Sequence, residues 1–330
     1  MMMIPQRFSR PAACAATIFL AAMACSSSAQ EDRPRNRFDH DILVETFGFD
    51  ETTPASVEFE HLYQGCPARD CIPSIDEPRY VDAEKAAEFM AEDELIMAMD
   101  YRGHQRAWPV RILDFHEIVN DSFDGEPVAI TWCPLCGSGV AFERRVNGKT
   151  VELGVSGVLH DSDLVMYDRA TESLWQQITG EAIMGPALGS VLTQVPVTMT
   201  TWGKWRDAHP DTVVLSIETG FDMDYGTDRR YAEYEASDQL AFPAARRDLS
   251  VHPKSVVFGF NIGEVDLAVM ESSLDEADGS LEREVNGENL TIKRRPDGTV
   301  IATDDAGNTY HSNRVFWFAW FNFHPGTIRI

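Results

Sequence analysis

The fold is decided by residues 127–155, which read PVAITWCPLCGSGVAFERRVNGKTVELGV. The apolar and β-branched runs in this stretch predict strands at Pro127–Cys133, Gly139–Val146 and Thr150–Val155. Between the last two runs stands Asn147-Gly148, a pair that favours the tight turn of a β-hairpin. The centre of the chain is therefore predicted to be antiparallel β-structure.

Short helices are predicted on both sides of this centre. Val110–Asn120 follows Pro109, a residue favoured at helix starts, and it places His116 on its apolar face. Thr201–His209 is also expected to be helical, with Pro210 ending it. These elements together predict a β-rich α+β fold.

Several segments recur along the chain, which predicts two related modules from an internal duplication. The set Trp202, Trp205, His209 and Pro210 recurs as Trp317, Trp320, His324 and Pro325. The segment 142–148 resembles 281–287, and 94–110 resembles the shorter 255–269. We expect an export signal at 1–29, an irregular leader at 30–79, a first module at 80–217, a linker at 218–250 and a truncated second module at 251–330.

The composition is globular and strongly acidic. The 330 residues contain 53 Asp plus Glu against 28 Lys plus Arg, a formal net charge of −25, and 44% of them are hydrophobic. A nucleic-acid partner is excluded as an expectation because no basic stripe is available to displace counterions from phosphates.

The N-terminus has the pattern of an export signal. Arg7 and Arg10 precede a small apolar run, Pro11–Ala24, which is too short to span a bilayer, and a serine cluster follows. Cleavage after Ala29 predicts a soluble exported protein, and Cys25 followed by serines is the alternative start of a lipid-anchored one. We expect a periplasmic or cell-surface location and no transmembrane segment.

The Cys133-Pro134-Leu135-Cys136 motif is the most specific local feature. A thioredoxin fold is rejected because a hairpin follows the motif, where a thioredoxin needs a helix start to lower the thiol pKa. Three interpretations of the pair stay open: a structural disulfide, a metal site of two thiolates, and a redox-cycling pair.

Histidines and acids near this motif are the other candidate site residues. Only a short loop separates the segment that contains His116 from the strand that ends at Cys133, so a Cys2His set with Cys136 is expected to bind copper or zinc. His160 is a further candidate ligand. The candidate acids that position water or substrate are Glu117, Asp121 and Asp168.

Cys66 and Cys71 are separated by four residues, a spacing that suits a local disulfide. A four-cysteine zinc site with Cys133 and Cys136 is the alternative.

The sequence resembles a bacterial family, domain of unknown function 3179, from about Ile72 to the C-terminus. The resemblance rests on the segments 65–76, 106–110, 116–121, 131–136, 163–169, 172–175, 229–234 and 316–320. It implies an exported or surface protein and supplies no activity. Cys66 and Cys71 stand where the family pattern has glycines, which favours an added disulfide, and His160 departs from that pattern too, which weakens it as a ligand.

Two functions of different classes follow. The first is an exported metal-binding or thiol-redox protein centred on Cys133, Cys136 and His116, with an enzymatic role left open. The second is a non-catalytic extracytoplasmic binding or scaffold module with structural disulfides.

Overall fold

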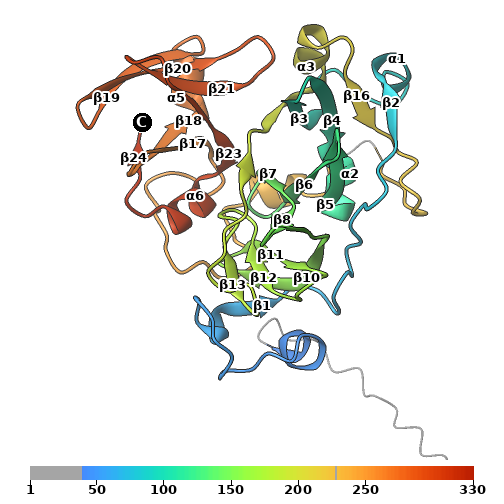
Figure 1. Cartoon of the computed structure of the whole chain (residues 1–330). Coiled ribbons are helices and arrows are strands. Elements are labelled where there is room, and N and C mark those ends of the chain that lie inside the picture. Colours follow the sequence, from blue (N-terminus) through green and yellow to red (C-terminus); the bar gives the residue numbers. More distant parts are fainter. Residues whose placement is uncertain (1–38, 227–228) are drawn as a thin grey trace, which may run out of the picture. The chain divides into compact units, whose positions relative to one another are not determined.

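The computed structural model describes residues 39–226 and 229–330, and its described part is β-rich with short helices (Figure 1). The predicted export signal and Cys25 lie outside the described residues. Among the described residues, no helix is long and apolar enough to cross a membrane. The leader up to residue 79 is mostly irregular, and its elements are η1 (Ile42–Thr46), η2 (Phe59–His61) and β1 (Leu62–Gln64).

A five-stranded sheet opens the first half of the chain, in the order β15-β3-β4-β16-β2. Its strands are β2 (Tyr80–Asp82), β3 (Leu95–Tyr101), β4 (His104–Pro109), β15 (Thr198–Thr201) and β16 (Val213–Leu215). The helices connected to it are α1 (Ala83–Ala86), α2 (Val110–His116) and α3 (Trp202–Ala208). The side chain of Asp82 caps α1 by accepting the Lys85 N–H, as expected for an N-terminal aspartate.

The decisive stretch forms a second sheet, in the order β14-β7-β6-β5. Its strands are β5 (Ile118–Phe123), β6 (Glu126–Cys133), β7 (Ser138–Glu143) and β14 (Gln194–Val195). The short β8 (Arg145–Val146) and β9 (Lys149–Thr150) then pair across Asn147-Gly148, and both turn residues have positive φ. The hairpin predicted from this pair is therefore present.

A third sheet, in the order β1-β10-β11-β12-β13, lies against the second (Figure 1). Its further strands are β10 (Leu153–His160), β11 (Asp163–Asp168), β12 (Leu174–Gln176) and β13 (Ala182–Met184). Strands β10 and β11 are buried along almost their whole length, including the polar residues Ser156, Asp163 and Asp168.

The remaining elements lie in the last third of the chain. After α4 (Ala232–Ala236) come two four-stranded sheets, in the orders β23-β17-β18-β24 and β19-β20-β21-β22. Their strands are β17 (Val256–Ile262), β18 (Val265–Met270), β19 (Ser280–Val285), β20 (Glu288–Arg294), β21 (Val300–Asp304), β22 (Thr309–His311), β23 (Asn313–Phe316) and β24 (Ile328–Arg329). The helices are α5 (Glu271–Glu276) and α6 (Trp317–Phe323).

The sheets β15-β3-β4-β16 and β23-β17-β18-β24 have the same strand directions. In each, a hairpin has an antiparallel neighbour on one side and a parallel strand on the other. The helix after the antiparallel neighbour repeats in detail. Trp205 stacks on His209, and Trp320 stacks on His324, each with ring centroids 3.9 Å apart.

One predicted detail is wrong. The predicted helix Val110–Asn120 ends at His116, because Glu117 adopts φ 56° and the chain continues as strand β5. The similar segments 142–148 and 281–287 each contain an Asn-Gly turn between two paired strands, β8–β9 in the first and β19–β20 in the second.

One buried apolar cluster joins both halves of the chain. It contains Cys133, Cys136 and Trp175 together with Val315 and Trp320. The sheet of the second half is thus packed against the cysteine motif of the first.

Candidate functional site

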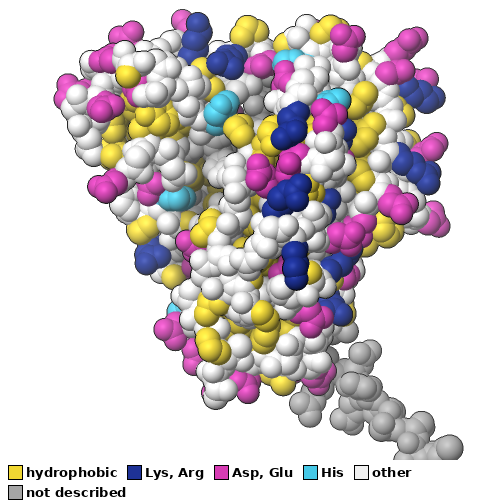
Figure 2. Space-filling model, in the orientation of Figure 1, with side chains coloured by type: hydrophobic (Ala, Val, Ile, Leu, Met, Phe, Trp, Pro, Cys, Tyr) yellow, Lys and Arg dark blue, Asp and Glu magenta, His cyan; other side chains and the backbone are white. Residues whose placement is uncertain are grey.

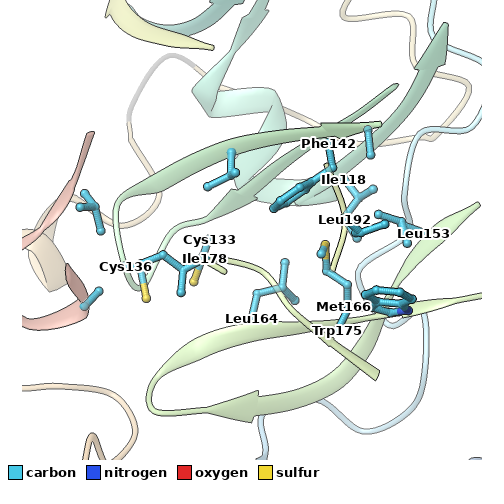
Figure 3. Close-up of a cluster of buried hydrophobic side chains, with 14 of the residues drawn as sticks. Ile118, Cys133, Cys136, Phe142, Leu153, Leu164, Met166, Trp175, Ile178 and Leu192 are labelled. Carbon is cyan, nitrogen blue, oxygen red and sulfur yellow. The ribbon is translucent and has the colours of Figure 1, made fainter. Parts of the chain in front are cut away.

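The cysteine motif forms a tight turn between β6 and β7. Cys133 ends β6, and the N–H of Cys136 donates to the carbonyl oxygen of Cys133 at 3.2 Å. Gly137 follows with φ +58°, a left-handed conformation that costs glycine little, and it turns the chain into β7. Figure 3 shows both sulfur atoms on the same side of this turn.

A carboxylate completes a cluster with the two thiols. One ligand atom each from Cys133, Cys136 and Asp163 lies within 4.8 Å of the others, and all three residues are buried. Asp163 begins β11 directly after a turn in which Asp161 and Ser162 both have positive φ. The Cys136 thiol also donates to the Ser162 carbonyl oxygen at 3.4 Å, so this turn contacts the motif directly.

The two oxygens of Asp163 have different surroundings. Oδ2 accepts hydrogen bonds from Gln176 Nε2 at 2.6 Å and from the Ile178 N–H at 3.0 Å. Oδ1 is buried and has no conventional hydrogen-bond partner. Burial raises the pKa of Asp163 from 3.8 to about 6, against the lowering effect of these hydrogen bonds. Both thiols are also within hydrogen-bonding reach of this carboxyl, so two sulfur atoms and one carboxylate oxygen form a set that could hold a metal ion.

The thiols themselves are strongly desolvated. Burial raises the pKa of Cys133 and raises that of Cys136 even further. Both are therefore neutral thiols at pH 7 unless a cation compensates the negative charge of the thiolates.

Two further acids lie next to the cluster. Burial, together with the smaller effect of the nearby Asp114 and Asp163, raises the pKa of Glu117 from 4.5 to about 8. Burial also raises the pKa of Asp114 to about 6, although its Oδ1 accepts a hydrogen bond from Trp132 Nε1 at 2.8 Å. At pH 7 Glu117 is mostly protonated and is a proton donor.

Glu117 also faces a pocket of about 180 Å³. Apart from Glu117 and Tyr231, the residues that line it are mostly apolar, and they include Leu135 of the motif and Leu164, which follows Asp163. Leu135 is next to Cys136 and Leu164 is next to Asp163 in the chain, and the two cysteines are themselves 1% and 0% exposed.

The structure does not bring His116 into the cluster. Its Nδ1 lies 2.7 Å from the carbonyl oxygen of Pro73, and its Nε2 lies 2.7 Å from the Tyr225 hydroxyl. A carbonyl oxygen only accepts, so Nδ1 carries the proton and Nε2 accepts from the tyrosine. Both ring nitrogens are used in the core, and the Cys2His set predicted from the sequence is replaced by a Cys2Asp set.

His160 does not belong to the cluster and is connected to it only through Gln176. Its Nδ1 donates to Gln176 Oε1 at 2.8 Å, and the amide of Gln176 donates in turn to Asp163. His160 therefore orients Asp163 through Gln176, the type of outer contact that fixes a metal ligand.

Asp121 and Asp168 are saturated with donors and are structural. Asp121 accepts from Tyr80 and Arg106. Asp168 accepts from Trp175 Nε1 at 2.9 Å and from the backbone of the following turn. Of the three predicted acids, only Glu117 has a carboxylate that accepts no hydrogen bond from a described residue and faces a pocket.

Cys66 and Cys71 form a disulfide with each other. This confirms the predicted local pair and removes the four-cysteine zinc site, because bridged sulfurs are not thiolate ligands. Cys133 and Cys136, in contrast, are both free thiols, which does not agree with a structural disulfide at the motif.

The sequence analysis missed Asp163 and Asp114. Asp163 follows the polar residues Asp161 and Ser162, which conceal the start of a buried strand. The available signal is the apolar run Leu164–Met166 directly after it, because an aspartate that opens a buried strand needs hydrogen-bond partners inside the protein.

The comparisons with known proteins identify a family. A family model described as "Protein of unknown function (DUF3179)" matches residues 69–310, which is most of the chain, so the chain belongs to this family. No curated protein and no solved structure matches the chain.

Proposed function

We propose that this DUF3179 protein is an exported metal-binding protein whose ion is held by Cys133, Cys136 and Asp163. The observation that carries the proposal is the Cys2Asp cluster, in which three buried donor atoms lie within 4.8 Å of one another. Two buried thiols with raised pKa values become thiolates when a metal ion replaces their protons.

Zinc fits this donor set better than copper. Thiolate sulfur and carboxylate oxygen are both usual zinc ligands, whereas copper(I) prefers soft donors alone. A divalent ion also offsets more of the negative charge of two thiolates and one carboxylate than a monovalent ion does. Three protein ligands leave the fourth position of a tetrahedral ion open, as in catalytic zinc sites.

Glu117 could donate a proton to a molecule bound at this open position. Its carboxyl is mostly protonated at neutral pH, and it lines the same pocket as Leu135 and Leu164, the chain neighbours of Cys136 and Asp163. A displacement of these leucines by a ligand would join the proton donor to the ion. We assign Glu117 the role of general acid for a pocket-bound molecule.

A thiol–disulfide exchange function is the second candidate. It is favoured by the two free thiols in one short turn, with their sulfur atoms on the same side (Figure 3). In that function the pair cycles between dithiol and disulfide by exchange with a partner disulfide, and Asp163 is a proton acceptor.

One experiment separates the two functions. The mature protein is purified from an exporting host, and its metal content and reactive thiols are measured. We expect one zinc ion per chain and two thiols that become reactive only after chelation, with the ion lost in Cys136→Ser. A metal-free protein with an oxidised Cys133–Cys136 pair contradicts metal binding and supports thiol exchange.

We further propose export by the signal at 1–29, with Cys25 as a lipid anchor if cleavage precedes it, and an internal duplication as the origin of the two halves. The disulfide Cys66–Cys71 supports export, because such bonds persist in oxidising compartments. Matching strand directions and the two Trp–His stacks support the duplication.

A further inference from the structure

A second pocket, of about 480 Å³, lies on another side of the cysteine motif. Trp132 and Gly137 of the first half line it, and so do residues of the segment 229–236 and of the second half. It shares no lining residue with the pocket that Glu117 faces.

This pocket is lined by more positive than negative charge, in a chain of net charge −25. Its charged residues are Arg229, Glu235, Lys254 and Arg314. Figure 2 shows acidic and basic side chains interspersed over the visible face of the molecule.

The three cations differ in how many of their N–H donors make hydrogen bonds within the protein. Lys254 Nζ donates to the carbonyl oxygens of Tyr234, Ser237 and Gln239, which uses its three protons. Its role is to fix the pocket wall. Arg229 pairs with Glu235, and its buried Nε has no hydrogen-bond partner.

Arg314 is the least satisfied of the three. Its guanidinium donates no hydrogen bond to a described residue, and its nearest carboxylate oxygen, on Glu271, is 3.9 Å from Nε. The side chain is only 18% exposed. An arginine with unused donors in such a place normally has a partner, and burial lowers its pKa while it has none.

The corresponding residue of the first half shows that the fold does not need this arginine. Arg314 lies opposite Phe258 in the pair β23–β17, three residues before Trp317. Met199 lies opposite Met97 in the pair β15–β3, three residues before Trp202. The same place in the sheet is therefore filled by an apolar side chain in one half and by a cation in the other.

From this geometry we infer that the pocket binds a small organic carboxylate between Arg314 and Arg229, with its apolar body against Trp132 and Phe316. A guanidinium group presents paired N–H donors that match the two oxygens of a carboxylate. The aromatic and alanine side chains of the wall complete a site for the rest of the molecule. The inference goes beyond the metal site and does not depend on it.

Calorimetric titration of the mature protein with sodium benzoate tests the site. The parallel probes are benzamide, its neutral analogue, and inorganic phosphate. The variants are Arg314→Met, with the side chain of the other half, and Arg229→Met. The control is Arg145→Met, an arginine that pairs with Glu126 and does not line the pocket. Melting curves establish that each variant is folded.

We expect benzoate to bind with one site per chain, benzamide not to bind, and each pocket variant to weaken benzoate binding about tenfold or more. The control variant is expected to bind as the wild type does. Equal binding of benzamide, or full benzoate binding by a folded Arg314→Met or Arg229→Met, overturns the site. Binding of phosphate without binding of benzoate overturns the carboxylate as its ligand.

Discussion

The backbone N–H of Phe316 donates to the carbonyl oxygen of Cys136 at 2.8 Å. This bond joins the last strand before α6 to the cysteine motif, which is 180 residues earlier in the chain. The second half thereby supports the loop that carries the thiols, although it has no cysteine of its own.

Replacement of Gly137 by alanine tests this support. A Cβ there would approach the Phe316 ring to 2.7 Å, and φ is +58°. We expect Gly137→Ala to lower the free energy of unfolding by about 2–4 kcal/mol, from strain and overpacking together. Urea unfolding measures the change.

Gly103→Ala is the matched control. Gly103 has φ +79°, and a Cβ there meets no atom within 4 Å, so this variant carries the backbone strain alone. We expect it to cost about 1–2 kcal/mol. An equal cost for the two variants would show that Phe316 does not press on the motif.

The ligand set is tested by comparing Asp163→Asn with His116→Gln. Asp163→Asn removes the anionic oxygen of the cluster, and we expect metal affinity to fall more than about tenfold. His116→Gln removes a ring that is bonded to Pro73 and Tyr225, and we expect full metal content with lower stability. Competition with a chromophoric chelator measures both affinities. Loss of the ion in His116→Gln, with the ion retained in Asp163→Asn, would support the Cys2His set and contradict the Cys2Asp set.

Asp114 gives the stability of the metal-free protein a defined pH dependence. Its pKa is about 6 in the folded state against 3.8 for the free side chain, so the folded protein holds this proton more tightly. The resulting stabilisation is complete below about pH 4 and is lost as the pH rises through about 6.

The variant Asp114→Asn removes this loss. We expect its advantage over the wild type to be small at about pH 4 and to approach about 3 kcal/mol at about pH 8, from the shift in pKa. Urea unfolding at both pH values measures it, with the exposed Asp211→Asn as the control. An advantage that does not change with pH refutes the assignment.

The correspondence of the two halves makes a quantitative prediction. Trp205 Nε1 donates to Thr212 Oγ1, and Trp320 Nε1 donates to Thr327 Oγ1, both at 2.9 Å. Thr212→Val and Thr327→Val each leave an indole N–H unpaired, and we expect each to cost about 1–3 kcal/mol. Thermal unfolding measures the two costs against the exposed Thr150→Val. A cost in one half only would argue that the two helices are not equivalent.

Much of the local structure could be predicted from the sequence. The hairpin at Asn147-Gly148 was predictable because its positive φ values demand such residues. The helix that ends at His116 was predicted too long, because Glu117 takes a left-handed conformation without glycine. Such a conformation in a buried glutamate is set by tertiary packing, which a local pattern does not contain.

The candidate site was predicted in part, and for a physical reason. The thiols are neighbours in the chain, so their proximity follows from the motif alone. Their third partner, Asp163, comes from another hairpin and reaches them only through the packing of one sheet on another. His116 is close in sequence, but its helix directs it toward Tyr225 and away from the cluster.

X-ray absorption at the edge of the bound metal tests the central claim most directly. For the purified mature protein we predict a zinc signal with two sulfur neighbours at about 2.3 Å and the remaining neighbours oxygen at about 2.0–2.2 Å. The Asp163→Asn variant is expected to lose this signal. A first shell without sulfur, or a protein without metal in which Cys133 and Cys136 are joined, would contradict the account.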